Sequence, residues 1–346
     1  MGTHDSLCPT CGREAASGTY CTQCGALLAP IAGERGAHFA AAPHEHLLTP
    51  AIVTTLFPHL PRRGHHSFRA LLAIGAALMV ALSLAGLFPV ALIAAAVLVP
   101  LLAVLYLREV DLYEEEPLRV LALTLVWGAL AGVAVGLLRD AVQSPSAVLA
   151  PQTQSSALLW NGVGLPLIGL VAALAGPLAL LRYRNFNDTL DGATFGSASA
   201  VAFAGAYLLT ESTTFLAAGL APAGLVEPWL LRIVTLGLAV PVLDACALGA
   251  VAASFWLRYR GPARDRRLHR ALATPPLALL AAGALLVGAA LAQIGLGRWP
   301  ALAVLVALDL AAVLWLRVAI QIGLVEERAE AEELPQSPCP NCRRVV

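Results

Sequence analysis

Long runs of apolar residues fill most of the chain between Ala70 and Leu324, and short polar segments separate them. Each run has about the 20 residues that a helix needs to cross the hydrocarbon core of a bilayer. Because the runs are rich in Leu and Ala and do not alternate between apolar and polar positions, they predict helices and not the strands of a barrel. We expect eight spans: Ala70–Phe88, Pro89–Leu107, Leu118–Leu138, Leu158–Leu181, Ala193–Ala218, Trp229–Trp256, Leu277–Leu296 and Trp299–Leu324.

The composition agrees with this pattern. Of the 346 residues, 58% are hydrophobic and only 13% are charged, and the mean hydropathy of +0.75 excludes an ordinary soluble domain. The formal net charge is zero, so no basic surface of the kind that binds nucleic acid is indicated. The fold predicted for residues 68–325 is therefore an all-α polytopic membrane bundle of about eight transmembrane helices, with the lipid bilayer as its solvent.

Arginines predict the orientation of the bundle, because positive charge stays on the cytosolic side of membrane helices. Three arginines lie between Arg62 and Arg69, before the first span, and six lie between Arg258 and Arg270, whereas the alternate loops hold almost none. Residues 1–67 contain no apolar core of the kind that a cleavable signal peptide has. We expect an integral, multi-pass protein of a bacterial plasma membrane with both termini in the cytosol.

Two Cys-x-x-Cys motifs stand near the N-terminus, at Cys8 and Cys11 and at Cys21 and Cys24. Such a turn points both sulfur atoms at one ion, and two turns complete the tetrahedral four-cysteine site that Zn²⁺ prefers. We therefore predict a structural zinc ribbon at residues 1–28. A disulfide pair and a redox-active motif are the alternatives; a cytosolic location argues against the first and the lack of a βαβ pattern against the second.

The segments before and after the bundle are polar. Residues 29–67 are rich in Ala, Pro, Gly and His and predict a flexible linker in which the histidines are solvated. Residues 326–346 form a cytosolic tail with one more motif, at Cys339 and Cys342. One motif supplies only half of a zinc site. The tail therefore either completes a site with ligands from another subunit, a partner or the linker histidines, or holds no metal.

Ionisable residues are few inside the spans, and at membrane depth they tend to face the bundle interior or a wet cavity. Glu211 and Arg232 are predicted at similar depth near the external surface, where they can form an ion pair. Asp244 and Asp309 are predicted near the midplane, either as an acid pair that handles protons or as carboxyls that only lock helix packing. We expect Arg317 to extend its guanidinium to the cytosolic surface.

Four segments carry a resemblance to a known family. Tyr113–Arg119 leads into the third span, which contains Trp127-Gly128-Ala129; Leu190–Gly196, with glycines spaced for close helix contact, opens the fifth span and Phe203–Glu211 continues it. In order and spacing they resemble the PrsW family of intramembrane proteases, over about residues 89–260. The resemblance implies a polytopic helical fold related to the CAAX prenyl endopeptidases, and cleavage of membrane-anchored anti-sigma factors.

The chain departs from the family's pattern at the positions that the resemblance implies for catalysis. Gly176 and Pro177 stand where the family has adjacent glutamates, and Asp244 stands near the position of the family's histidine. Glu211 is retained, but Ser212 follows it in place of the usual Asn. Peptide hydrolysis needs one group that activates water and another that protonates the leaving amine, directly or through a metal. The usual machinery for these steps is missing.

Three functions are compatible with these observations. The first, which we favour, is a PrsW-like protein that has lost proteolysis, binds transmembrane helices of a client protein and recruits a cytosolic partner through its zinc ribbon. The second is an active intramembrane protease that uses Glu211 and Asp244 as a substituted acid/base pair. The third is an ion or proton-coupled transporter built around Asp244 and Asp309.

Removal of the metal tests the zinc ribbon. A segment this small cannot bury a core without its metal, so we expect a chelator to abolish the ordered structure of a peptide covering residues 1–30. The measurement is the amide spectrum of the zinc-loaded peptide before and after chelation. A spectrum that does not change would contradict the assignment.

Overall fold

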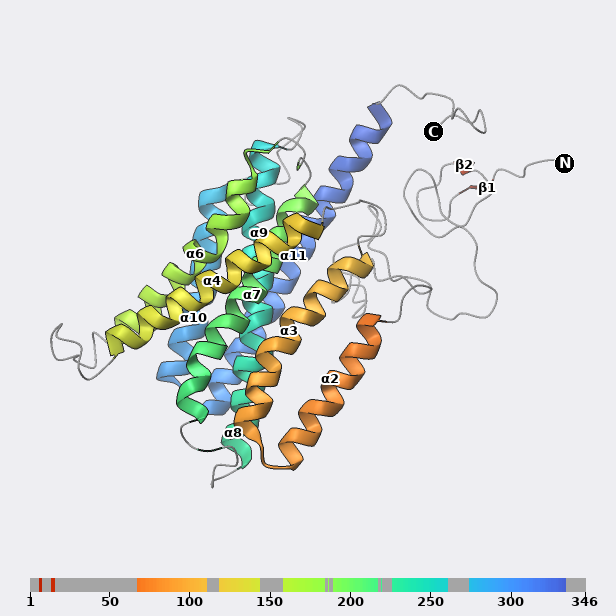
Figure 1. The fold of residues 1–346 in the computed structure, drawn as a ribbon. Coiled ribbons are helices and arrows are strands. Elements are labelled where there is room, and N and C mark those ends of the chain that lie inside the picture. The colour runs from red at the N-terminus through yellow and green to blue at the C-terminus, as the bar shows by residue number, and fades with distance from the viewer. Residues whose placement is uncertain are drawn as a thin grey trace.

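The computed structural model describes two short strands, β1 (Ser6–Leu7) and β2 (Glu14–Ala15), and a set of helices. The helices lie side by side in one bundle, with α2 outside α3 and the end of α11 projecting beyond its neighbours (Figure 1). The described residues are 6–7, 14–15, 67–110, 118–143, 158–183, 186, 189–216, 219, 226–260 and 274–333.

Eight helical segments build the described part of the bundle, and two of them contain a π-helical turn. Each coincides with one of the eight predicted apolar runs. In chain order they are α2 (Ser67–Leu84), α3 (Phe88–Val110), α4 (Leu118–Gln143), η1 with α6 (Trp160–Gly164, Leu165–Leu180), α7 (Thr189–Leu216), α8 with η2 and α9 (Val226–Val234, Thr235–Ala239, Val240–Tyr259), α10 (Pro275–Gly295) and α11 (Arg298–Glu333).

Seven of the described segments are long and apolar enough to cross a bilayer, which confirms the prediction of a polytopic helical membrane protein. The first segment is shorter than predicted, since its apolar part covers only Ala70–Leu84. The helix ends before Gly86, whose φ of 73° lies in the left-handed region that glycine tolerates. The chain then turns back into α3 at Phe88.

Each of the two π-helical turns is followed by a proline. Pro166 comes after η1 and Pro241 after η2. A proline lacks the N–H that would bond the carbonyl four residues earlier, and its ring crowds that carbonyl, which belongs here to Gly162 and Gly237. A π turn relieves the crowding because its hydrogen bonds reach back five residues. The prolines therefore explain why the π-helical turns occur just before Pro166 and Pro241.

The central element of the bundle is α7, which contacts α3, α4, α6, α9 and α11. Of its membrane window, 67% is buried, the largest share among the seven spans, although its mean hydropathy of 1.3 is the lowest. Its faces carry Gly, Ala and Ser at many positions where the other spans carry Leu. Small residues let helix backbones approach closely, so α7 gains contact area without long apolar side chains.

Three glycines spaced four residues apart on α4, namely Gly128, Gly132 and Gly136, contact α7. A Cβ atom at Gly128 would collide with the carbonyl oxygen of Ser199, and one at Gly132 with the carbonyl oxygen of Phe203. Both contacts advance in the same direction, so α4 and α7 run parallel. The two backbones are in contact at these glycines. A side chain on α4 at either position would hold the helices apart.

On another face of α7, Gly192 and Gly196 lie against α9, which confirms the close contact predicted from their spacing. A Cβ atom at Gly196 would lie 2.8 Å from the carbonyl oxygen of Leu248. Ser197 adds a hydrogen bond between the helices, because its Oγ donates to the carbonyl oxygen of Ala245 at 2.9 Å. Backbone packing and a side-chain hydrogen bond therefore fix α9 in register with α7.

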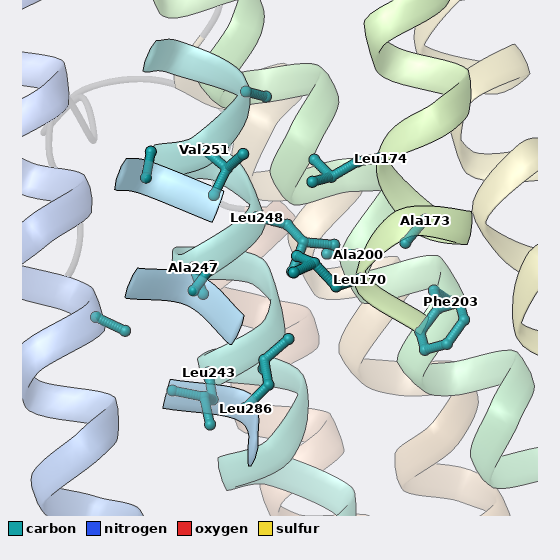
Figure 2. Close-up of a cluster of buried hydrophobic side chains, with 14 of the residues drawn as sticks. Leu170, Ala173, Leu174, Ala200, Phe203, Leu243, Ala247, Leu248, Val251 and Leu286 are labelled. Carbon is teal, nitrogen blue, oxygen red and sulfur yellow. The ribbon is translucent and has the colours of Figure 1, made fainter. Parts of the chain in front are cut away.

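The apolar core lies between α6, α7, α9 and α10, while large apolar side chains such as Leu280, 70% exposed, cover the outside. An apolar exterior is what helices in contact with lipid require. Figure 2 shows the part of the core formed by Leu170, Ala173, Leu174, Ala200, Phe203, Leu243, Ala247, Leu248, Val251 and Leu286.

The two strands pair antiparallel, with Ser6 opposite Ala15 and Leu7 opposite Glu14. In the sequence they flank the first Cys-x-x-Cys motif. The zinc ribbon and the C-terminal half-site stay predictions, because their cysteines lie outside the described residues, as does the linker: Cys8, Cys11, Cys21, Cys24, Cys339 and Cys342.

Replacement of Gly132 by Ala tests the close packing of α4 on α7. The new methyl group would meet backbone atoms that cannot swing aside, so we expect a loss of about 1–3 kcal/mol in the free energy of unfolding in detergent micelles. Gly288→Ala on α10 is the matched control, because the nearest atom to its Cβ would be in the Leu308 side chain at an ordinary 3.8 Å. Equal stability of the two variants would contradict this account of the packing.

Candidate functional site

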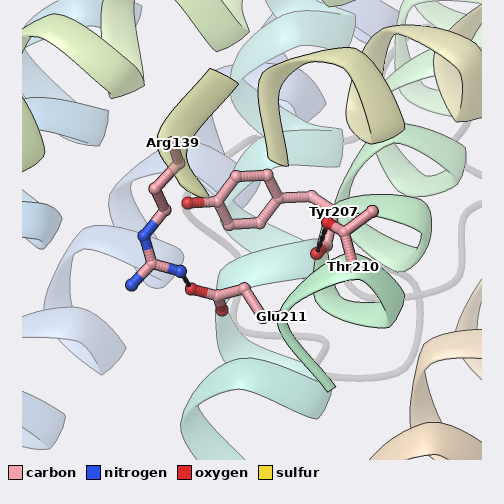
Figure 3. Close-up of polar contacts among 4 residues, drawn as sticks. All are labelled: Arg139, Tyr207, Thr210 and Glu211. Carbon is pink, nitrogen blue, oxygen red and sulfur yellow. Dashed lines mark hydrogen bonds and ion pairs between the residues drawn. The ribbon is translucent and has the colours of Figure 1, made fainter. Parts of the chain in front are cut away.

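Glu211, one of the two predicted catalytic residues, lies near the end of α7 and forms an ion pair with Arg139 at the end of α4 (Figure 3). The side chains of Arg139 and Glu211 are 29% and 13% exposed, so the pair is largely shielded. The guanidinium of Arg139 also lies over the ring of Tyr207, 5.9 Å from its centroid. The guanidinium of Arg139 thus contacts both the carboxylate of Glu211 and the ring of Tyr207, which lie one turn apart on α7.

The partner of Glu211 differs from the expected one. We expected Arg232, and the ion pair that the structure shows for Glu211 is with Arg139. The glycine contacts bring the last turns of α4 alongside the end of α7, which places Arg139 at the depth of Glu211. Arg232 is exposed, and its guanidinium lies 5.3 Å from the centroid of the Trp229 ring.

Asp244 and Asp309 lie near the middle of their spans, on α9 and α11. Each is partly buried, and the two are close enough for their charges to interact. Cys246 is also within reach of the charge of Asp309. The Oδ1 atom of Asp309 is buried and has no hydrogen-bond partner among the described residues. These side chains form a polar region at membrane depth, and the charge of Asp244 also reaches Tyr207, whose ring lies under Arg139.

Glu211 and Asp244 lie at different levels of the bundle. Ser197 bonds to Ala245, the neighbour of Asp244, and Glu211 follows Ser197 by fourteen residues on α7. Tyr207, one turn before Glu211 on α7, is nonetheless within electrostatic reach of both Arg139 and Asp244. The acid/base pair that we considered stays a prediction.

The two positions that the resemblance assigns to paired glutamates, Gly176 and Pro177, are filled by helix packing. Gly176 lies against the indole ring of Trp127 on α4, with no room for a side chain. The indole is held in place because its Nε1–H donates to the carbonyl oxygen of Ala172 at 2.9 Å. Pro177 is fully buried in the bundle. An acidic side chain at either position would displace existing contacts.

Arg317 also differs from its expected position, because it is only 3% exposed and does not extend to the membrane surface. The small residues Ala193, Ala253 and Ala319 surround this part of α11 and let the helices approach closely. The C-terminal half of the α11 span is thus more enclosed at Arg317 than the charge of this residue suggested.

The described residues contain no group of three or more His, Cys, Asp or Glu side chains arranged to hold a metal ion. Within this part of the chain, Cys246 is the one cysteine, and all eight histidines fall in other segments. A catalytic zinc site has three protein ligands and one open position. The donors of the described bundle therefore do not form such a site.

The role of Arg139 was missed at the level of sequence, although the sequence holds a signal for it. The spacing of Gly128, Gly132 and Gly136 marks the face of α4 that approaches another helix. Arg139 follows Gly136 by three residues and so lies on about the same face.

Comparison with known proteins bears on the same part of the chain. Residues 116–273 match the family model described as PrsW family intramembrane metalloprotease. Neither a curated protein nor a solved structure matches the chain. The matched segment begins before α4 and ends beyond α9, so it contains Arg139, Glu211 and Asp244. Over these residues the chain is similar to the PrsW family, as the resemblance of its motifs indicated.

Proposed function

We propose that this protein is a PrsW-like membrane protein that binds transmembrane helices of client proteins without hydrolysing them, and that its zinc ribbon recruits a cytosolic partner. One observation carries the proposal: helix packing fills the positions at which the resemblance implies the family's paired glutamates. Trp127 covers Gly176, and Pro177 is fully buried. An indole ring and a proline ring hold no group that activates water.

The carboxyls that remain are poorly arranged for hydrolysis. General acid–base catalysis needs both groups within hydrogen-bond reach of the reacting atoms. The carboxylate of Glu211 is engaged by the guanidinium of Arg139, which competes with its use as a base. The proposal that Glu211 and Asp244 act as acid and base is therefore weaker than the binding proposal.

The family description implies a metal, since it names a metalloprotease. The donors of the described bundle do not fit one: Glu211 is paired with Arg139, and Asp244 and Asp309 supply two carboxyls where three ligands are needed. No hydrolytic step through a metal is therefore proposed for this chain.

Helix binding suits a bundle of this kind. Lipid tails are as apolar as Leu side chains, so helices associate in a membrane through close packing and through hydrogen bonds between polar side chains. The chain already uses both devices between α7 and its neighbours. The cytosolic ribbon, joined by a linker predicted to be flexible, would hold a soluble partner near the captured helix.

A cleavage assay tests the absence of hydrolysis. We expect the purified protein to leave a reporter with a cleavable transmembrane helix intact, because helix packing fills the positions that the resemblance assigns to the paired glutamates. The measurement is the amount of fragment formed in proteoliposomes, with an active member of the PrsW family as the positive control on the same reporter.

Any specific cutting by the wild-type protein would contradict the proposal. Cutting that Glu211→Gln and Asp244→Asn both abolish would establish the alternative, an active protease with substituted acids. Cutting that both variants retain would exclude these residues as the catalytic pair as well.

A double-mutant cycle tests whether Glu211 is a packing residue. We expect Glu211→Gln and Arg139→Gln each to lower the free energy of unfolding by about 1–2 kcal/mol, because each leaves a shielded charge without its partner. The double variant should lose less than the sum of the two single losses. Strictly additive losses, measured in the same micelles, would show that the pair contributes no coupling.

A further inference from the structure

Two spans of the bundle, α6 and α9, end side by side (Figure 1). Their apolar windows end at Leu180 and at Tyr259. Arg260, the residue after α9, donates from Nη2 to the carbonyl oxygen of Leu181 and, at 3.3 Å, to that of Tyr183. One guanidinium therefore joins the two helix ends and satisfies carbonyl groups just past the C-terminus of α6.

The α6–α9 junction, as we call residues 181–183 and 258–260, holds two more arginines, Arg182 and Arg258, whose side chains are exposed. Neither forms an ion pair with a residue that the structure describes. Among the described residues of α6, α9 and α10, the one carboxyl is that of Asp244, fourteen residues before Arg258 and so about 20 Å away along the helix. These two positive charges therefore have no counter-ion in this part of the chain.

The depth of the junction in the membrane indicates what surrounds the two arginines. Both lie within two residues of the end of an apolar span, where hydrocarbon gives way to lipid headgroups. The rings of Tyr183 and Tyr259, each more than half exposed, are typical of the same level. The guanidinium of Arg182 lies 5.5 Å from the centroid of the Tyr183 ring. Lipid headgroups are therefore the surroundings of these cations.

We propose that the α6–α9 junction binds the headgroup of an anionic phospholipid through Arg182 and Arg258. The inference goes beyond the proposed function, since it holds whether or not a client helix binds.

Charge and hydrogen-bonding capacity favour an anionic lipid over a zwitterionic one. A guanidinium offers pairs of N–H donors that match two oxygens of one phosphate. A zwitterionic headgroup carries the same phosphate together with an ammonium group, which the arginines would repel. Deeper in the membrane, exposed apolar side chains of α6 such as Val171 give the acyl chains a surface to pack on.

A lipid held by both arginines would bridge the ends of α6 and α9, as the side chain of Arg260 does. A ligand that binds only the folded bundle stabilises it by mass action. We therefore expect an anionic phospholipid both to bind at the junction and to raise the Tm of the protein.

Native mass spectrometry of the full-length protein in detergent micelles tests the proposal. The probes are phosphatidylglycerol and phosphatidylcholine with identical acyl chains, so that they differ only in the headgroup. We expect the wild-type protein to bind phosphatidylglycerol about tenfold more tightly than phosphatidylcholine. The double variant Arg182→Gln, Arg258→Gln should bind the two lipids alike, and its Tm should no longer respond to phosphatidylglycerol.

The matched control removes two exposed arginines from the opposite end of the bundle, Arg232 and Arg298. That end holds a carboxylate of its own, because Glu227 accepts a hydrogen bond from the indole of Trp299 at 2.8 Å. Arg232→Gln with Arg298→Gln changes the net charge by the same amount and should leave the lipid preference unchanged.

A variant that keeps the charges separates a binding role from a structural one. Arg182→Lys with Arg258→Lys should retain most of the preference for phosphatidylglycerol, because both cations remain. The comparison of the two lipids on the wild-type protein tests the site even if a variant at the junction fails to fold.

Equal binding of the two lipids by the wild-type protein would overturn the inference. A preference that the junction variant with two glutamines keeps, or that the control variant also loses, would overturn the assignment to Arg182 and Arg258. Displacement of phosphatidylglycerol by an equal concentration of inorganic phosphate would assign the site to a soluble anion, which also overturns the inference. Each of these results would leave the proposed binding of client helices intact.

Discussion

Contact between helix backbones along α7 is the constraint on which the rest of the bundle depends. Gly128 and Gly132 of α4, and Gly192 and Gly196 of α7, each remove a Cβ atom from a place where another backbone lies. In lipid there is little hydrophobic gain from pressing one apolar helix on another, so such close packing must provide much of the stability. The depth of every functional side chain follows from the register that these contacts impose.

That register sets the levels at which the polar side chains lie. Arg139 reaches Glu211 because α4 runs parallel to α7 through its glycines. Asp244 lies at another level because Ser197 ties α9 to the first half of α7. The same retained glutamate that the resemblance implies for catalysis is thus held as one end of an interhelical ion pair.

The sequence predicted the fold well, because the physical signal for a membrane helix is a long apolar run and nothing competes with it. The bounds of α10, for example, follow directly from Leu277–Leu296. The ion pair of Glu211 with Arg139 was not predicted, since it depends on the direction in which α4 packs on α7. The burial of Arg317 was likewise not predicted, because no local pattern of the sequence reveals which helices pack around it.

The widened turn at Thr235–Ala239 also decides which way Asp244 faces. A π turn accommodates one residue more than an α turn, so it rotates all that follows by about 100° about the helix axis. Helical-wheel reasoning carried from Trp229 through to Asp244 would therefore assign the carboxyl to the wrong side. A chain with one residue fewer in this turn would keep its hydropathy profile and still direct Asp244 toward different neighbours.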